Sequence, residues 1–209
     1  MSFADRPDTS REVTSRERIH EGKVFDLVAE RVRLSADDAE PVLREYLDHP
    51  GAVAIVPLRD GPGGEEIALV DQYRHPARAV LWEIPAGLLD VDGEDYLEAA
   101  RRELAEETDL LAGRWDVLVD FFTTPGGSSE SLRIYLARDL RPVPDAERYQ
   151  RSEEERDMTV RWVSLDEAVA AVHAGRLHNP SAVVGILAAA SARAAGWAPL
   201  RPTDAPWIR

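Results

Sequence analysis

Apolar residues recur along the chain with two periods, and each period predicts a different kind of element. Alternating or short apolar runs predict strands over residues 24–34, 41–48, 67–73, 81–84, 115–123, 132–137 and 158–163. Residues 51–58, with the sequence GAVAIVPL, are apolar without interruption, which indicates a strand buried on both faces. Residues 1–18 are polar and are expected to be frayed or bound at a sheet edge.

Helical patterns lie between and after these strands. The clearest covers residues 94–108, preceded by a loop over 85–93. Ser164 with Glu167 forms a capping box for a helix that reaches about residue 173, and Asn179 caps another over residues 181–195. This mixture predicts an α/β (α+β) fold, with residues 1–48 as a small separate sheet and residues 49–209 as the main domain.

Composition and charge narrow the classes of partner. The 209 residues are 44% hydrophobic and 31% charged, as in a globular chain, and the net charge of −14 argues against binding to nucleic acid or to an anionic membrane. Cysteine is absent, so no disulfide or thiolate site exists, which suits a cytoplasmic location. No apolar run reaches eighteen residues and no signal peptide is visible, so no membrane span is predicted.

The predicted helix over 94–108 carries an unusual set of carboxylates. Glu103 and Glu107 are four residues apart and therefore lie on one face, with Glu106 beside them. Like charges at this spacing destabilise a helix by roughly 0.2–0.5 kcal/mol per pair, and the dipole disfavours anions near the helix C-terminus. A hard divalent cation would turn this repulsion into ligation. The alternative interpretation is a solvated acidic face on an ordinary surface helix.

A wider motif surrounds these carboxylates. Gly87, Glu94 and the run Arg102-Glu103-Leu104-x-Glu106-Glu107 resemble the Nudix box, the loop-helix signature of a family that hydrolyses nucleoside diphosphates linked to another group. The segments Gln72-Tyr73-Arg74 and Trp82 to Gly87 extend the resemblance, which covers residues 20–200 and implies a Nudix-like α/β/α sandwich with a mixed sheet. The loop between Gly87 and Glu94 is one residue longer than usual, and Asp109 stands where the family usually has glycine.

The resemblance implies a metal site on this helix. Glu103 and Glu107 correspond to the main metal ligands, Glu106 to a third, and the carbonyl of Ala86 to a backbone ligand. The expected ion is Mg²⁺, with Mn²⁺ as the alternative. Arg102, which we count among the catalytic residues, and Glu94 correspond to a pair that braces the helix; the alternative is a simple surface ion pair.

Other residues are implied to act on the substrate. Pro125, at a fixed distance from the box, resembles the mark of the ADP-ribose pyrophosphatase branch, although a Pro-Gly-Gly-Ser-Ser loop also suits a plain turn. Arg44 and Arg74 correspond to positions that contact the diphosphate or nucleotide, since a guanidinium can bind phosphate through two hydrogen bonds. Glu130 is expected to face ribose hydroxyls and Phe25 to stack on adenine, unless Phe25 is a core residue.

The resemblance implies a general base on a loop after the sheet, which here is the charged loop over residues 141–155. The candidates are Glu153, Glu154 and Glu155, of which we favour Glu155 and then Glu154; the alternative is an acidic loop that only aids solubility.

The predicted activity is hydrolysis of ADP-ribose to AMP and ribose 5-phosphate. Two alternatives remain open: a pyrophosphatase for another nucleotide sugar such as GDP-mannose, and a module that binds ADP-ribose without cutting it. The resemblance also implies a homodimer in which the N-terminal strands, residues 1–48, pair across the two chains.

Overall fold

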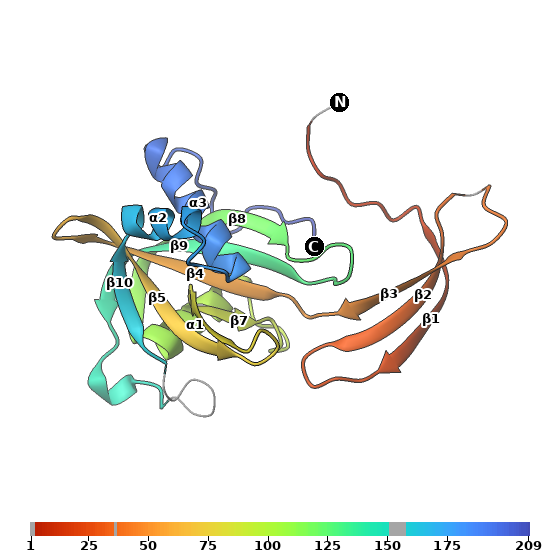
Figure 1. Ribbon diagram of the computed structural model, residues 1–209, viewed down its shortest axis with the longest axis horizontal. Helices are drawn as coiled ribbons and strands as arrows, with labels where there is room; N and C mark the ends of the chain where they lie inside the picture. Colours follow the sequence, from red (N-terminus) through yellow and green to blue (C-terminus); the bar gives the residue numbers. More distant parts are fainter. Residues whose placement is uncertain (1–2, 36, 151–157) are drawn as a thin grey trace. The chain divides into compact units, whose positions relative to one another are not determined.

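The computed structural model describes residues 3–35, 37–150 and 158–209, which form two compact units (Figure 1). The small unit comprises Met1–Gly51, Phe122–Ser131 and Pro206–Arg209, and the large unit comprises Ala52–Phe121 and Leu132–Ala205. The small unit thus contains more of the chain than the N-terminal segment expected from the sequence.

The small unit is built on a three-stranded antiparallel sheet in the order β1-β2-β3. Its strands are β1 Glu12–His20, β2 Asp26–Arg33 and β3 Val42–Asp48. Every residue of β1 is exposed, and the strand lies at the edge of the sheet, where it pairs with β2 over residues 12–20 with two register shifts. Val28 is the one buried residue of the three strands, which leaves the sheet almost no apolar core of its own.

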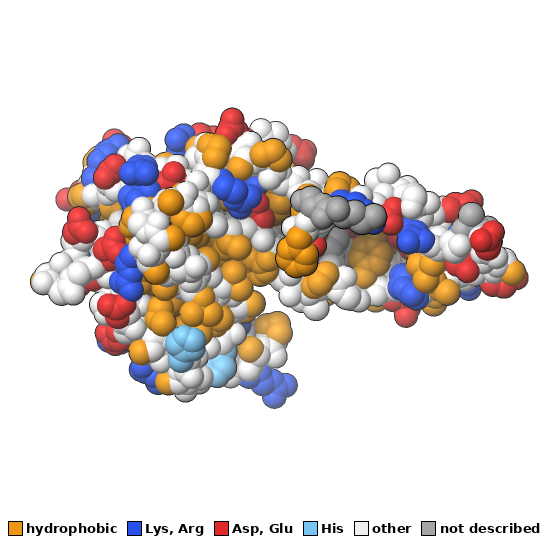
Figure 2. Space-filling view, turned by 90° about the horizontal axis from the view of Figure 1, so that it is seen from above, with side chains coloured by type: hydrophobic (Ala, Val, Ile, Leu, Met, Phe, Trp, Pro, Cys, Tyr) orange, Lys and Arg blue, Asp and Glu red, His pale blue; other side chains and the backbone are white. Residues whose placement is uncertain are grey.

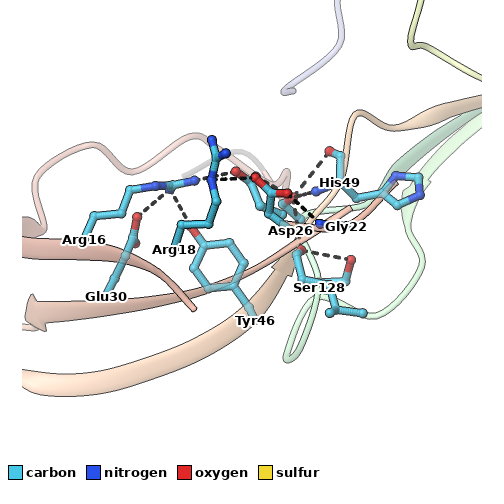
Figure 3. Close-up of polar contacts among 11 residues, drawn as sticks. Arg16, Arg18, Gly22, Asp26, Glu30, Tyr46, His49 and Ser128 are labelled. Carbon is cyan, nitrogen blue, oxygen red and sulfur yellow. Dashed lines mark hydrogen bonds and ion pairs between the residues drawn. The ribbon is translucent and has the colours of Figure 1, made fainter. Parts of the chain in front are cut away.

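Polar contacts across the strands hold this sheet together. Arg16 on β1 donates to the Glu30 carboxylate at 2.7 Å and to the Tyr46 hydroxyl at 3.0 Å, and it also pairs with Asp48 at the end of β3 (Figure 3). Burial and the Glu30 carboxylate together raise the pKa of Tyr46. One guanidinium therefore links all three strands, where a larger sheet would use a packed hydrophobic face.

Residues 123–130 also belong to this unit and form the loop that joins strand β8, Leu110–Phe122, to strand β9, Ser131–Pro142. The backbone N–H of Leu47 donates to the carbonyl of Gly127 at 3.0 Å, and the N–H of Ser129 donates to the carbonyl of Leu47 at 2.9 Å. The Pro-Gly-Gly-Ser-Ser segment therefore runs beside the end of β3, which is more than a plain turn between two strands requires.

The large unit is organised around a mixed sheet in the order β10-β5-β4-β9-β8, with β6 paired to β5 and β7 paired to β4. β4 runs parallel to β9 and antiparallel to β5 and β7. The strands are β4 Ala52–Gly61, β5 Gly64–Arg74, β6 Ala79–Glu83, β7 Ala86–Leu88, β8 Leu110–Phe122, β9 Ser131–Pro142 and β10 Val160–Ser164.

Packing on both faces of the central strand β4 explains why residues 51–58 are apolar without interruption. Ala54 and Val56 face a core cluster that includes residues of helices α2 Leu165–His173 and α3 Pro180–Ala194. Val53 and Ile55 face a second cluster with residues of helix α1 Tyr96–Thr108. Successive side chains of a strand point to opposite faces, so the sheet is covered by helices on both sides. This confirms the predicted α/β/α sandwich with a mixed sheet.

Local capping signals account for the helix boundaries. The Ser164 side chain accepts from the N–H of Glu167 at the start of α2, and the Asn179 side chain accepts from the N–H of Ala182 at the start of α3, as the sequence predicted. A single 3-10 turn, Asp145–Glu147, follows β9. None of the described helices combines the length and apolarity that a bilayer crossing requires.

Three details differ from the sequence-based expectations. The loop over 85–93 contains the short strand β7, because Ala86 to Leu88 pair with Ala54 to Ala52 of β4. β8 begins at Leu110 rather than at residue 115, directly after α1. The final segment, which the sequence left without a role, forms a backbone bridge from Arg201 to Val117 of β8, and Ala205 is buried in the cluster on the α1 side.

Candidate active site

Helix α1 is set by polar residues at both ends. The Asp95 carboxylate accepts from the N–H of Leu97 and caps the N-terminus. At the other end Asp109 adopts the left-handed conformation, with φ 56°, and its N–H donates to the carbonyl of Ala105. Asp109 therefore takes the conformation expected for the position where the family usually has glycine, and aspartate tolerates it better than most residues.

The carboxylates of Glu103 and Glu107 lie on the inner side of α1. Glu103 is 8% exposed and Glu107 is 5% exposed. The Glu107 Oε2 accepts from the backbone N–H of Ala86 in β7 at 3.1 Å. A Cβ at Gly87 would lie 1.9 Å from the Glu103 Oε1, so only glycine leaves room for this carboxylate against β7. The inner side of α1 and the strand β7 thus enclose two buried acids.

Arg102 lies between the carboxylates of this helix. Its Nε and Nη2 donate to the two oxygens of Glu94 at 3.1 and 3.0 Å, and its Nη1 donates to Glu103 and, at 3.3 Å, to Glu106. The Arg102 guanidinium holds the pKa of Glu94 below its ordinary value, while Glu94 and then Glu103 raise the pKa of Arg102. One cation therefore contacts three of the four carboxylates.

The chemistry of this cluster suits a hard divalent cation. Three carboxylates of α1, that of Glu94 just before the helix, and one guanidinium lie together, and two of the carboxylates are buried, where uncompensated negative charge is costly. Among the described residues, no three acidic or histidine side chains already converge as a ligand group. The contacts explain this, because Glu103 and Glu106 are turned toward Arg102 while Glu107 is turned toward Ala86.

A family model for the NUDIX domain matches residues 48–182, which includes β7, the following loop and all of α1. The chain belongs to the Nudix family. The resemblance stated from Gly87, Glu94 and the Arg102 to Glu107 run is therefore confirmed at the level of the family.

Relatives of this Nudix chain match it over most of its length. It is 45% identical to an ADP-ribose pyrophosphatase of Mycobacterium tuberculosis over 94% of this chain and 91% of the relative. It is 33% identical to an ADP-ribose pyrophosphatase of Bacillus subtilis over 82% of this chain and 88% of the relative. A crystal structure of an ADP compounds hydrolase superposes with a TM-score of 0.72 over 92% of this chain and 99% of that chain, and at 19% identity it supports the fold alone.

Arg74, expected to contact the substrate, lies at the end of β5. Its Nε and Nη2 donate to the two oxygens of Glu83 on β6 at 2.9 and 2.7 Å. Glu83 is 2% exposed, whereas the Arg74 side chain is 42% exposed. The buried carboxylate therefore fixes the orientation of a guanidinium that still reaches solvent. No role is predicted for Glu83 from the sequence, although it lies three residues before Ala86.

Phe25 and Glu130 come together in the small unit around a histidine that the sequence did not single out. The rings of Phe25 and His49 stack with centroids 6.3 Å apart, and the Glu130 Oε1 lies 3.9 Å from the His49 Nε2. The His49 Nδ1 accepts from the N–H of Gly51 at 3.0 Å, so the neutral ring carries its proton on Nε2, facing Glu130. Thr123 also donates to Glu130, at 2.6 Å.

The remaining predicted site residues are Arg44 and the three loop glutamates. Arg44 is exposed on β3 and its Nη1 donates to the carbonyl of Leu43 at 2.8 Å. Glu153, Glu154 and Glu155 lie outside the described residues. The chain that follows them is anchored at Thr159, whose N–H and hydroxyl donate to Asp71 at 2.8 and 2.7 Å. These two bonds lower the pKa of Asp71 despite the opposing effect of its burial.

Replacing Gly87 with alanine tests the close approach of Glu103 to β7. The new Cβ would overlap the Glu103 carboxylate, so that side chain must move while the backbone of β7 stays. We expect Mn²⁺ affinity, measured by electron paramagnetic resonance, to fall by on the order of ten- to a hundredfold. Gly63→Ala is the matched control, because nothing lies within 4 Å of its Cβ. Equal affinity in wild type and Gly87→Ala would contradict the assignment of Glu103.

The Arg102–Glu94 pair predicts a pH-dependent contribution to stability. Because Arg102 lowers the pKa of Glu94 below 4.5, the stabilisation is fully present above that pH and is lost as the pH falls through the folded-state pKa. Glu94→Gln should therefore lower the free energy of unfolding by about 1–2 kcal/mol at pH 7, with the difference shrinking below about pH 4. Urea unfolding of both proteins across this range measures it; a difference that grows toward acid pH contradicts the pairing.

Proposed function

We propose that this chain hydrolyses ADP-ribose to AMP and ribose 5-phosphate with the help of Mg²⁺, Mn²⁺ being the alternative ion. The observation that carries the proposal is the buried pair Glu103 and Glu107: Glu103 packs against Gly87 of β7 and contacts Arg102, and Glu107 accepts from the backbone of β7. The relatives named ADP-ribose pyrophosphatase support the choice of substrate.

The reaction adds one water across the diphosphate. The water oxygen forms a bond to one phosphorus atom, the bridging P–O bond breaks, and the bridging oxygen leaves with the other phosphate. Divalent ions, when bound, supply positive charge against the diphosphate and increase the acidity of water. In this proposal Glu103, Glu106, Glu107 and the Ala86 carbonyl hold the ions.

The arginine of the motif has a positioning role in this proposal. Arg102 would keep its two bonds to Glu94, while Glu103 and Glu106, which its Nη1 group contacts, would be available to hold a divalent ion. The bidentate geometry to Glu94 supports this division, because it leaves the Nη1 group as the contact that an ion replaces. Arg102 therefore holds the helix carboxylates in register before the ion binds.

Substrate contacts are proposed for Arg74, Phe25, Glu130 and Arg44. In the large unit, Arg74 binds a phosphate or the nucleotide with the orientation that Glu83 imposes on it. In the small unit, Phe25 offers a ring for adenine, Glu130 accepts hydrogen bonds from ribose hydroxyls, and Arg44 contacts the diphosphate. The clustering of Phe25 and Glu130 around His49 supports a shared task for these two residues.

Product analysis decides among the candidate activities. ADP-ribose and GDP-mannose are each incubated with the full-length protein, with and without Mg²⁺, and the products are identified by chromatography and mass. The proposal expects AMP and ribose 5-phosphate from ADP-ribose only when the ion is present. Faster release of GMP from GDP-mannose would assign the chain to another nucleotide sugar, and tight binding of ADP-ribose without products would make it a binding module.

Two further proposals concern the cellular location and the oligomeric state of the protein. We propose a cytoplasmic location, supported by the absence of cysteine. We also propose a homodimer formed through the small unit, supported by a sheet that buries one residue yet exposes apolar side chains such as Val13, Ile19 and Leu43.

Glu107→Gln separates the ligand role of this carboxylate from its structural role. The amide oxygen of glutamine can still accept from the Ala86 N–H, so the fold should persist, while turnover of ADP-ribose falls at least about a hundredfold because the charge is lost. Glu98→Gln is the control, since Glu98 lies on the same helix and, among the residues that the structure describes, forms an ion pair only with the exposed Arg101. Near-normal turnover of Glu107→Gln at saturating Mg²⁺ would refute the assignment.

The general base is proposed to be Glu155, with Glu154 as the second candidate. Glu155→Gln should lower the turnover number by about 10²- to 10⁴-fold without changing the affinity for Mn²⁺, because a base moves protons and does not hold the ion. Turnover and Mn²⁺ affinity are measured for both single variants. If Glu154→Gln alone shows this behaviour, the base is Glu154.

The dimer proposal predicts a specific dependence on β1. Val13→Glu together with Ile19→Glu places charges on exposed apolar positions of β1 and should shift the mass in solution, measured by light scattering, from two chains to one. Glu17→Gln, also on β1, is the control. A wild-type protein that is monomeric and fully active contradicts the proposal.

A further inference from the structure

A cavity of about 200 Å³ lies between α2 and the edge of the sheet formed by β5, β6 and β10. Its apolar walls are Leu69, Trp82, Val163, Ala168, Ala171 and Leu177. Five of these six residues belong to or pack against the core cluster on the α2–α3 side of the sheet. The carboxylates of α1 lie on the other side, so this cavity is separate from the candidate active site.

The cavity exists because two alanines face the sheet from α2. Ala168 and Ala171 are three residues apart and occupy the same side of the helix, where longer side chains would fill the space. On the opposite wall, Arg161 and Val163 share one face of β10, and Arg161 is paired in register with Leu69 of β5. Most of the lining is therefore fixed by regular helix and strand geometry, and Arg176 and Leu177 are added from the turn after α2.

The turn that ends α2 brings a second arginine to the cavity. Gly175 adopts a positive φ of 66° and donates its N–H to Val172, while the N–H of Arg176 donates to Ala171. This C-terminal cap reverses the chain, so that Arg176 and Leu177 return over the end of the helix and line the cavity. Within the described part of the chain, the Arg176 side chain makes no hydrogen bond or ion pair.

The charges at the cavity favour an anion. Two guanidinium groups and one carboxylate, Glu167, line it, although the chain as a whole carries a net charge of −14. Arg161 and Glu167 are 3.9 Å apart and their side chains are 60% and 53% exposed, so this pair is weak and easily replaced. A negative ligand group is therefore attracted here by two arginines, while the apolar walls favour a flat hydrophobic body.

We propose that this cavity is a binding site for a small monoanion with a flat apolar body, such as an aromatic carboxylate. The body packs on Trp82 and Leu69 between α2 and the sheet, and the carboxylate is bound by Arg161 and Arg176. The size agrees with a single ring, because a cavity of roughly 150 Å³ accommodates benzene in a protein interior. The site requires no contribution from the diphosphate chemistry of α1.

Titration with phenylacetate, followed by ¹H–¹⁵N NMR on the full-length protein, tests the site. We expect saturable shifts of the Trp82 indole N–H, assigned through Trp82→Phe, and binding at least about fivefold weaker for the neutral phenylacetamide. Arg176→Gln removes one of the two guanidinium groups that line the cavity and should lower the affinity for phenylacetate by at least about fivefold. Ala171→Leu fills the cavity and should abolish the Trp82 shift. Arg148→Gln is the control, because Arg148 is not among the residues that line the cavity.

Several results would overturn the proposal. Equal affinities for phenylacetate and phenylacetamide would show that the negative charge of the ligand does not contribute to binding. Phenylacetate binding that is unaffected by both Arg176→Gln and Ala171→Leu would show that phenylacetate binds outside this cavity. If phenylacetate fails to bind and Ala171→Leu lowers the mass of the protein in solution, the cavity receives a side chain of a second copy. If Ala171→Leu fails to fold, Arg176→Gln still tests the site, because the Arg176 side chain is exposed and its replacement should leave the fold intact.

Discussion

The burial of two carboxylates on one helix is the constraint on which the rest of the large unit depends. Glu103 and Glu107 lie on the inner side of α1, where an ionised group loses most of its hydration. The protein offsets this loss with a backbone N–H from Ala86 and a guanidinium from Arg102. Gly87 follows from the same constraint, since any side chain there would occupy the space of the Glu103 carboxylate.

Much of the large unit follows from local rules that a sequence displays. The caps Ser164 and Asn179 begin α2 and α3 where predicted, because a capping side chain bonds to backbone groups within its own turn. The strand 51–58 is apolar throughout because helices cover both faces of the sheet. By contrast, the sequence predicts a loop where β7 forms, since three residues are too few to show a period and their pairing with β4 is a long-range contact.

The same distinction separates the parts of the candidate site. Glu94, Arg102 and the helix carboxylates could be grouped from the sequence because one helix and its leading loop bring them together. Glu83 and His49 could not be assigned a role from the sequence, because their partners Arg74 and Glu130 lie on other strands or loops. No regular sequence spacing predicts such a contact. The polar sheet of the small unit escaped prediction in the same way, since Arg16 links strands that are distant in sequence.

Strand β6 shows how one short segment serves two faces of the sheet. Trp82 packs on the α2–α3 side and lines the cavity, whereas Glu83 points to the opposite side and orients Arg74. Their order is fixed by pairing with Asp71 and Val70 of β5. A shift of this pairing by one residue would exchange the two faces, burying the indole where the arginine needs a carboxylate and exposing the carboxylate to the apolar cavity. Because side chains of β6 alternate between the two faces of the sheet, the cavity and the Arg74–Glu83 pair stay on opposite sides. Both nevertheless depend on the same register of β6 against β5.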